Sequence, residues 1–437
     1  MTDLFYTEEE LEKAIMVGVW LGKNNSAVLD LEGSLEELAF LAETAGIEVV
    51  GEISQNLINP NPKTYIGSGK VEELKLLTDE LGADMVLFDD ELSPRHQREL
   101  EEVFGNKVKV IDRTALILDI FAQHADTAEG KLQVELAQLH YRLPRLTRAW
   151  THLARQAGGG GGRTGSVGGV GLRGPGETQL ETDRREIQKR ITKLEDELEK
   201  VRERRARHRS QRKKSNIPIV ALVGYTNAGK STLLNAISSA EIYVADQLFA
   251  TLDPTIRQLQ LPGGTEVLVS DTVGFIQKLP TQLVAAFRAT LEEINEADLL
   301  LHIVDASHEH YLEQSYSVLE TLREIDAGEI PILTVYNKID LLDAETLDDL
   351  EQDAGQDTYF ISAKTGEGIE ALQEAIADEL FTGQSMVKVL LPYSEGKLVS
   401  IFHERGNVIN IEHLEEGILI YGRLPKETLP YFREYAI

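Results

Sequence analysis

The stretch "IPIVALVGYTNAGKSTLLNAI" at residues 217–237 constrains the fold more than any other part of this chain. A β-rich run from Ile217 to Val223 leads into Gly224-x-x-x-x-Gly229-Lys230-Ser231, and an amphipathic helix follows. This is the pattern of a phosphate-binding loop in its strand–loop–helix context. The glycines let backbone N–H groups converge on phosphate oxygens, Lys230 supplies a positive charge, and Ser231 supplies a hydroxyl for Mg²⁺. The stretch therefore predicts an α/β unit whose loop binds a nucleotide through Gly224, Tyr225, Thr226, Asn227, Ala228, Gly229, Lys230 and Ser231.

Three later segments narrow the nucleotide to GTP. "VLVSDTVGF" reads as a strand ending in Asp271-Thr272-Val273-Gly274, where the aspartate can hold a magnesium-bound water and the glycine N–H can meet a γ-phosphate. "ILTVYNKID" ends in Asn337-Lys338-Ile339-Asp340, and "YFISAKTGEG" contains Ser362-Ala363-Lys364. We expect Asp340 to be a buried acid that accepts two hydrogens from guanine N1 and N2, an edge that adenine lacks. We expect the backbone of the last segment to donate to guanine O6. All four segments end strands of one α/β unit, where ligands gather.

The region between the loop helix and the next strand, "DQLFATLDPTIRQL", must supply a switch threonine for Mg²⁺ and the γ-phosphate. Thr251 is favoured, with Thr255 and, less readily, Thr232 as alternatives. Many GTPases place a glutamine after the Asp-x-x-Gly motif to orient the attacking water. Phe275 stands there instead and cannot hydrogen-bond water, which predicts slow intrinsic turnover unless Gln277, another route or a partner positions the water.

The N-terminal part, residues 1–115, alternates short apolar runs such as "AIMVGVWL" and "ADMVLFDD" with helical segments such as "SLEELAFLAETAG". Such alternation predicts a small α/β domain with a largely parallel sheet. "YIGSGKVEEL" superficially resembles a second phosphate loop, but Thr64 stands at the first glycine position and Val71 replaces the hydroxyl residue. We interpret it as an ordinary helix start.

Charge is distributed unevenly over the 437 residues. The total is −29, whereas residues 142–214 carry 20 Lys/Arg against 9 Asp/Glu, a net +11, which leaves −40 for the rest. This segment contains "ARQAGGGGGRTGSVGGVGLRGPGET" at 154–178, with eleven glycines, three arginines and no acid before Glu177. A plain linker needs no arginines, so we interpret the tract as a loop at the tip of a helical arm that reaches RNA phosphates. The acidic remainder excludes a protein that coats nucleic acid over its whole surface.

Apolar residues follow the tract at heptad-like spacing and predict one face of a long helix: Leu180, Ile187, Ile191, Leu194, Leu198 and Val201. We expect four domains: an α/β domain (1–115), a helical arm (116–214), a nucleotide-binding domain (217–383) and a small α+β domain (384–437). The last of these should have strands in "SMVKVLLPY", "NVINIEHL" and "GILIYGRL". The chain has no cysteine, which excludes disulfides and Cys-ligated metals, and no signal peptide or membrane-spanning run is expected.

The motifs "FATLDPT" and "DTVGF", and above all "GPGETQLETDRR" ahead of a basic helical segment, resemble the HflX family of bacterial GTPases over nearly the whole chain. The resemblance implies an N-terminal HflX domain, a long helical hairpin, a P-loop GTPase domain and a short C-terminal domain. It also places Mg²⁺ at Ser231 and Thr251, and extends the GTP/GDP site to Phe249, Ala250, Thr251, Leu252 and Asp253. Lys230, Thr251 and Gly274 would carry catalysis, and the family, like this chain, lacks the glutamine.

The resemblance further implies a ribosome-stimulated GTPase that binds the large (50S) ribosomal subunit and dissociates idle or stalled 70S ribosomes under stress. We expect rRNA contacts through residues 142–214, no DNA binding, a monomer, and a location in the cytoplasm or peripherally at the membrane. Three alternatives stay open: a GTPase of large-subunit assembly, an RNA-remodelling protein using ATP at the N-terminal domain, and a GTP-gated scaffold.

Overall fold

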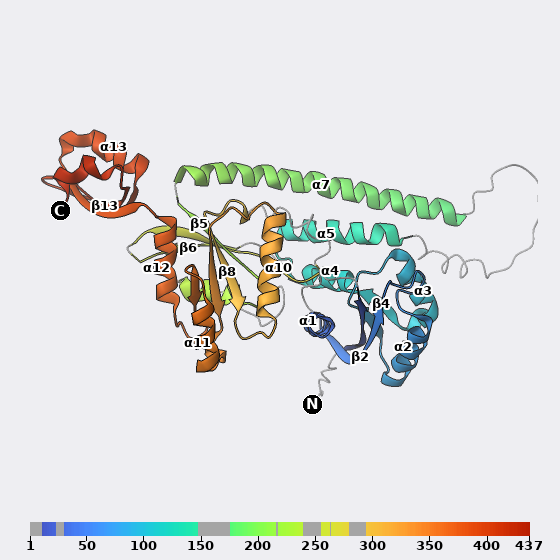
Figure 1. Cartoon of the computed structure of the whole chain (residues 1–437). Coiled ribbons are helices and arrows are strands. Elements are labelled where there is room, and N and C mark those ends of the chain that lie inside the picture. Colours follow the sequence, from blue (N-terminus) through green and yellow to red (C-terminus); the bar gives the residue numbers. More distant parts are fainter. Residues whose placement is uncertain are drawn as a thin grey trace, which may run out of the picture. The chain divides into compact units, whose positions relative to one another are not determined.

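The computed structural model describes residues 11–22, 30–146, 175–215, 217–238, 255–262, 264–278 and 294–437. The chain forms two compact units. The first comprises residues 1–204 with 247–253 and 276–289, and the second comprises 205–246, 254–275 and 290–437. Figure 1 labels their elements.

The first unit is built on a four-stranded sheet in the order β2-β1-β3-β4. All three strand pairs are parallel, as the alternation of strands and helices predicted. β1 lies between β2 and β3 in the sheet. Its six consecutive residues 14–19 are buried, which shows that both faces of this strand are covered. The strands are β1 (Glu12–Leu21), β2 (Ile47–Leu57), β3 (Met85–Phe88) and β4 (Lys109–Asp112).

Two helices cover one face of this sheet. Val71 and Leu74 of α2 (Ser68–Leu81) and Leu100 and Phe104 of α3 (Pro94–Phe104) join the strand residues in one apolar cluster. α2 begins directly after Gly67, which confirms the interpretation of "YIGSGKVEEL" as a helix start. The remaining elements are α1 (Leu31–Thr44), α4 (Arg113–His124) and the 3₁₀ turn η1 (Gly105–Lys107).

Helical segments follow the sheet. α5 (Ala128–Arg142) ends in the 3₁₀ turn η2 (Leu143–Arg145), and α7 (Pro175–Ser215) is a single long helix. α7 runs alongside α5 (Figure 1), where Arg190 forms two 2.7 Å hydrogen bonds to Glu135. The predicted apolar face is confirmed at its centre, because Ile191, Leu194 and Leu198 are buried. The glycine-rich tract falls almost wholly outside the described residues.

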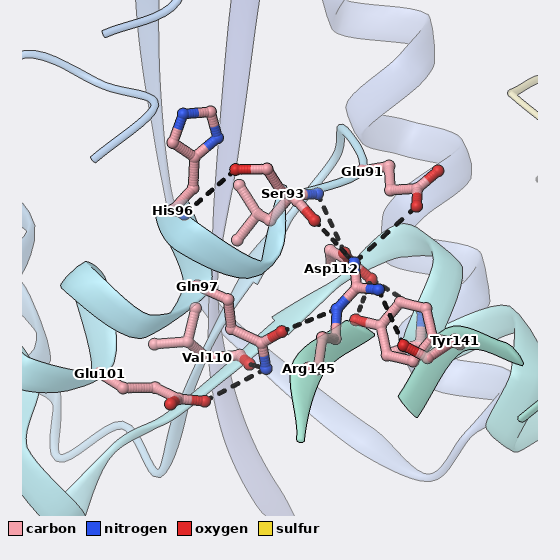
Figure 2. A network of polar contacts seen from close by, with 11 residues as sticks. Glu91, Ser93, His96, Gln97, Glu101, Val110, Asp112, Tyr141 and Arg145 are labelled. Atoms are coloured by element: carbon pink, nitrogen blue, oxygen red, sulfur yellow. Dashed lines mark hydrogen bonds and ion pairs between the residues drawn. The ribbon is translucent and has the colours of Figure 1, made fainter. Parts of the chain in front are cut away.

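Arg145 closes a polar network at the carboxyl end of β4 (Figure 2). Its guanidinium donates to the carbonyls of Tyr141 and Leu92 at 3.0 and 2.6 Å, and to Gln97 at 3.1 Å. It also lies over the Tyr141 ring at 3.5 Å and within 3.4 Å of Asp112. The side chain is only 11% exposed, so Arg145 serves this fold and its charge is not presented to solvent.

The second unit contains a six-stranded sheet in the order β10-β9-β8-β5-β7-β6. Every pair is parallel except β6 with β7, so β6 is an antiparallel edge. The strands are β5 (Ile219–Gly224), β6 (Thr255–Gln260), β7 (Glu266–Asp271), β8 (Leu299–Asp305), β9 (Ile332–Asn337) and β10 (Thr358–Phe360). The helices are α8 (Lys230–Ile237), α10 (Tyr311–Glu324), η3 (Ile339–Leu341), α11 (Ala344–Asp353) and α12 (Ile369–Leu380).

A small antiparallel sheet in the order β11-β13-β12 ends the chain, with the three strands where the sequence predicted them. Phe402 and Phe432 meet edge to face in its core. Its elements are β11 (Gln384–Leu391), η4 (Tyr393–Glu395), α13 (Gly396–Arg405), β12 (Asn407–Leu414), β13 (Gly417–Pro425) and η5 (Leu429–Tyr435). Within the described residues, no helix is both long and apolar enough to cross a membrane.

Candidate nucleotide site

The predicted phosphate loop joins β5 to α8. Gly229 has φ +93°, a left-handed conformation that favours glycine, and α8 begins at the next residue. The Lys230 ammonium is buried beneath the loop, where it donates to the carbonyls of Gly224 and Tyr225 at 3.0 and 2.7 Å. The loop therefore has the strand–turn–helix geometry that the sequence predicted, with its lysine held at the centre.

Strand pairing brings the two predicted magnesium-site oxygens together. Leu222 of β5 lies opposite Asp271 of β7 in the parallel register, and the Ser231 hydroxyl donates to Asp271 Oδ2 at 2.7 Å. The next residue, Thr272, is buried and donates to the Leu222 carbonyl at 2.6 Å. A hydroxyl and a carboxylate are the hard oxygen ligands that Mg²⁺ prefers.

Gly274 lies directly against the phosphate loop. A Cβ at this position would stand 2.9 Å from Thr226 Cα and 3.1 Å from Lys230 Nζ, so any larger residue would displace the loop. The following residue, Phe275, forms two backbone hydrogen bonds with the phosphate loop. Thr226 N–H donates to the Phe275 carbonyl at 2.8 Å, and Phe275 N–H donates to the Gly224 carbonyl at 3.1 Å. The Asp-x-x-Gly segment and the loop are thus in direct contact.

Asn337 connects the loop with the two segments predicted for the base. Its amide donates to the Ala228 carbonyl at 2.8 Å, while its Oδ1 accepts from Ala363 N–H at 2.9 Å. A Cβ at Gly229 would stand 2.2 Å from Asn337 Nδ2, so this glycine is needed for the approach. The sequence predicted Asn337 in the site, but not that its side chain joins its own segment to those of Ala228 and Ala363.

Asp340 corrects one expectation. The sequence predicted a buried acid, but Asp340 is exposed, because it lies on the short turn η3 and its neighbour Ile339 takes the buried position. Its Oδ1 accepts from the Ser362 hydroxyl at 2.6 Å. Lys338, with φ +66°, pairs with Asp305 at 2.7 Å. The carboxylate is oriented by hydrogen bonding instead of burial.

Two cationic or titratable groups are buried at the centre. Burial lowers the pKa of the Lys230 ammonium from 10.5 to about 8, and the Asp271 carboxylate opposes this shift. On β8, burial and the nearby Lys230 charge lower the pKa of His302 from 6.5 to about 4. His302 is 1% exposed, and nothing in the sequence pattern marked it, since it lies within an apolar strand run.

Some predicted residues cannot be placed. Phe249, Ala250, Thr251, Leu252 and Asp253 lie outside the described residues. Of the two alternatives to Thr251, Thr255 begins the edge strand β6 and Thr232 lies on α8. Phe275 and Gln277 are both buried.

Two known proteins are similar in sequence to this chain over nearly its full length. A GTPase HflX of Caldanaerobacter subterraneus is 46% identical over 426 residues, covering 98% of this chain and 94% of the relative. A GTPase HflX of Escherichia coli is 46% identical over 417 residues, covering 95% and 94%. The chain belongs to the HflX family of GTPases.

Family profiles match the HflX chain in three consecutive blocks. "GTP-binding GTPase N-terminal" matches residues 32–122, "GTP-binding GTPase Middle Region" matches 124–212, and "50S ribosome-binding GTPase" matches 219–338. As a member of this family the chain is a GTP hydrolase, and the fold is the P-loop GTPase architecture that the sequence predicted.

Among solved structures, a complex of the protein SsGBP with GDP is 27% identical, with a TM-score of 0.43, over 84% of this HflX chain and 98% of that chain. A GDP-bound GTP-binding protein from Sulfolobus solfataricus is 25% identical, with a TM-score of 0.41, over 85% and 99%.

Proposed function

We propose that this HflX GTPase binds GTP and Mg²⁺ through the assembled segments and uses its nucleotide state to bind the large ribosomal subunit and dissociate 70S ribosomes. The observation that carries the nucleotide assignment is the bridge made by Asn337. It joins the phosphate loop at Ala228 to the base segment at Ala363, so phosphate and guanine contacts are held at a fixed separation.

Each residue in this proposal has a defined role. The backbone from Gly224 to Ser231 surrounds the phosphates. Lys230 contacts the β- and γ-phosphates, and this charge pairing offsets the cost of burying its ammonium. Gly274 N–H meets the γ-phosphate. Asp340 accepts from the guanine edge, and the backbone of Ser362, Ala363 and Lys364 donates to O6. Asp271, Thr272 and Val273 connect the strand to that glycine.

The donor set fits Mg²⁺. Ser231 and Asp271 would hold it, the serine directly and the aspartate through water, with Thr251 as the third proposed group. When bound, the ion neutralises charge on the β- and γ-phosphate oxygens during transfer. The chain's own contribution is to fix Ser231 against Asp271 before the nucleotide arrives.

Asp340→Asn tests the base assignment. The amide replaces an acceptor by a donor opposite guanine N1 and N2, so preference for GTP over ATP should fall by roughly 2 to 4 kcal/mol. Competitive binding of GTP, ATP and XTP measures this. A matched control is Asp343→Asn, because Asp343 is a nearby aspartate that caps α11. Unchanged discrimination in Asp340→Asn would contradict the assignment.

The ribosomal part of the proposal is supported by the "50S ribosome-binding GTPase" match and by the basic segment 142–214 on an acidic chain. A positive segment on a repelling body favours one orientation against rRNA phosphates. Arg145 must be removed from the expected contact set, because its guanidinium is engaged within the fold. Exposed residues of α7, including Arg184, Arg185 and Lys189, remain in the set.

Density-gradient profiles of 70S ribosomes mixed with the protein and GTP, a non-hydrolysable GTP analogue or GDP test dissociation. We expect free subunits with the GTP forms and intact ribosomes with GDP. Intact ribosomes under all three nucleotides would refute splitting, and action only on immature large subunits would favour the assembly alternative. Binding without dissociation or any dependence on hydrolysis would favour the scaffold.

The ATP alternative at the N-terminal domain gains no support from its pocket. This pocket, beside α1, contains the carboxylates Asp30, Glu32, Glu36 and Glu52 and no lysine or arginine among its described lining residues. Four carboxylates repel a triphosphate. The described residues of this pocket therefore favour the second unit as the site of nucleotide chemistry.

A further inference from the structure

The first unit has an acidic groove between α1 and the edge strand β2. α1 packs closely on β1, where a Cβ at Gly18 would stand 2.9 Å from Leu31 Cδ1. β2 is the next strand and the first in the sheet order, and its side chains Glu52, Ser54 and Asn56 are exposed. These three side chains and one side of α1 line a pocket of about 610 Å³, which we call the acidic groove.

The apolar part of the groove lies deeper than the charged part. The parallel register pairs Met16 of β1 with Glu52 and Trp20 with Asn56, so the apolar side chains lie beside the exposed ones. Met16 is buried and Trp20 is half-buried. The apolar lining residues are Met16, Trp20, Leu31, Leu35 and Ala39. A ligand that enters the groove can therefore bury apolar surface as well as meet charges.

The carboxylates of the groove have no cationic partner within the described residues. Asp30 accepts from Gly33 N–H at 2.8 Å as the cap of α1, and Glu32, Glu36 and Glu52 form no ion pair in this part of the chain. The four acidic side chains are exposed at the mouth of the groove: Asp30, Glu32, Glu36 and Glu52. Their mutual repulsion is relieved by a cation and increased by a phosphate, so the groove selects a positively charged ligand.

The outer edge of β2 offers backbone groups for an added strand. Gly22 N–H donates to the Leu57 carbonyl at 3.2 Å, so Leu57 and alternate residues before it point toward β1. The backbone N–H and C=O groups of Glu52, Ser54 and Asn56 therefore point outward, where the described sheet has no further strand. An extended peptide at this edge would pair with these groups and place every second side chain over the groove.

We propose that the acidic groove binds an extended, lysine- or arginine-rich segment of a partner protein, which adds as a strand to the edge of β2. Alternate cationic side chains meet Glu36 and Glu52, while their aliphatic stems cover the apolar lining at Met16 and Leu35. The Trp20 ring receives one cation on its face. A second copy of this chain would double the number of carboxylates at the same edge and is disfavoured. The inference concerns the first unit alone and is independent of the proposed nucleotide and ribosome functions.

The test measures peptide binding to the full-length protein through tryptophan fluorescence. In a Trp150→Phe background Trp20 is the only tryptophan, so its emission reports on the groove. The probe is a synthetic peptide of the length of β2, with lysine at every second position and threonine between. We expect a saturable change in emission, with an affinity that falls as salt is raised.

A block isomer of the peptide, with the same composition but consecutive lysines, separates strand addition from simple charge attraction. In an extended chain only about half of its lysines face the groove, so it should bind at least about fivefold more weakly.

Substitutions at the mouth of the groove locate the binding site. Glu36→Gln combined with Glu52→Gln removes two carboxylates and should weaken binding of the alternating peptide about tenfold. Glu72→Gln combined with Glu80→Gln is the matched control, because both glutamates are exposed on α2, which packs on the opposite face of the sheet. The affinity of this control should stay within about twofold of the parent value.

Ser54→Pro tests the added strand at the backbone. Proline lacks the N–H, which at this position points away from β1, so the pairing of β1 with β2 is retained while one edge donor is lost. Peptide affinity should fall at least about fivefold, whereas Ser54→Ala, which keeps the N–H, should stay within about twofold. Circular dichroism checks that the variants are folded.

Three results would overturn the proposal. Equal affinity for the alternating peptide and its block isomer would rule out strand addition, and this comparison still decides if Ser54→Pro unfolds the first unit. Unchanged affinity in the Glu36→Gln and Glu52→Gln double variant would rule out the groove. An equal response of Trp20 to spermine at the same concentration of positive charge would assign the groove to small polycations instead of a peptide.

Discussion

One buried residue, His302 beside Lys230 in the candidate nucleotide site, makes the stability of the protein depend on pH. His302 has a folded-state pKa of about 4 against 6.5 for an ordinary histidine. Between these values the unfolded chain binds a proton that the folded protein excludes, so stability is lost as pH falls from 6.5 toward 4. The shift corresponds to a loss on the order of 3 kcal/mol across this window.

His302→Gln cannot titrate, so it should lose this part of the acid sensitivity. Urea unfolding of the wild type and the variant at pH 7, 6, 5 and 4.5 measures the difference. The two stability curves should converge as pH falls, because only the wild type loses the contribution of His302. The effects of carboxylate protonation are common to both proteins. Parallel curves would show that His302 does not change its protonation preference on folding. His310, on the surface turn before α10, gives a matched His→Gln control.

At the scale of elements, the arginines at the end of α5 separate fold from partner binding. Arg145 is engaged by Leu92, Gln97 and Tyr141, whereas Arg142, one turn earlier, is exposed. Arg145→Ala should lower the free energy of unfolding by about 2 to 3 kcal/mol, because it leaves Asp112 and the Leu92 carbonyl without a charged donor.

Arg142→Ala should change stability by less than about 0.5 kcal/mol. Chemical denaturation of both variants, with ribosome binding measured under folding conditions, distinguishes their roles. The assignment of Arg145 to the fold fails if its variant unfolds like the wild type but binds ribosomes weakly.

Element positions were largely predictable from the sequence. The strand at "AIMVGVWL", the helix start in "YIGSGKVEEL" and the apolar face of α7 each follow from local patterns, and all are present. The order of the parallel strands was not predictable, because their neighbours are fixed by crossovers that leave no local signal in the sequence.

Within the candidate site, the loop motif predicted Lys230 and Ser231 but not the partners that surround them. Asn337 bonds to Ala228, which lies 109 positions earlier in the chain, and His302 is buried because of its strand neighbours. A sequence motif records local geometry, whereas these contacts depend on the tertiary arrangement.

At the scale of the whole molecule, the separation of charge predicts how the proposed ribosome binding would depend on salt. Some positive charges of the basic segment are already compensated by ion pairs within the protein. Arg190 of α7 pairs with Glu135 of α5, and Lys193 pairs with Glu197. Arg184, Arg185 and Lys189 are exposed on the same helix. Phosphate contacts release counterions, so each one that is lost should lower the salt slope of binding by about 1.

Replacing Arg184, Arg185 and Lys189 together by glutamine should therefore reduce the slope of log affinity against log salt by about 3 and weaken binding most at low salt. Sedimentation of the GTP-analogue form with large subunits from 50 to 300 mM salt, a range about the physiological value, measures it. Arg190→Gln removes a charge that Glu135 already compensates and should leave the slope nearly unchanged. Equal slopes for the triple variant and the wild type would exclude these three residues from the proposed rRNA contact, because exposed cations that neutralise phosphates cannot be removed without changing counterion release.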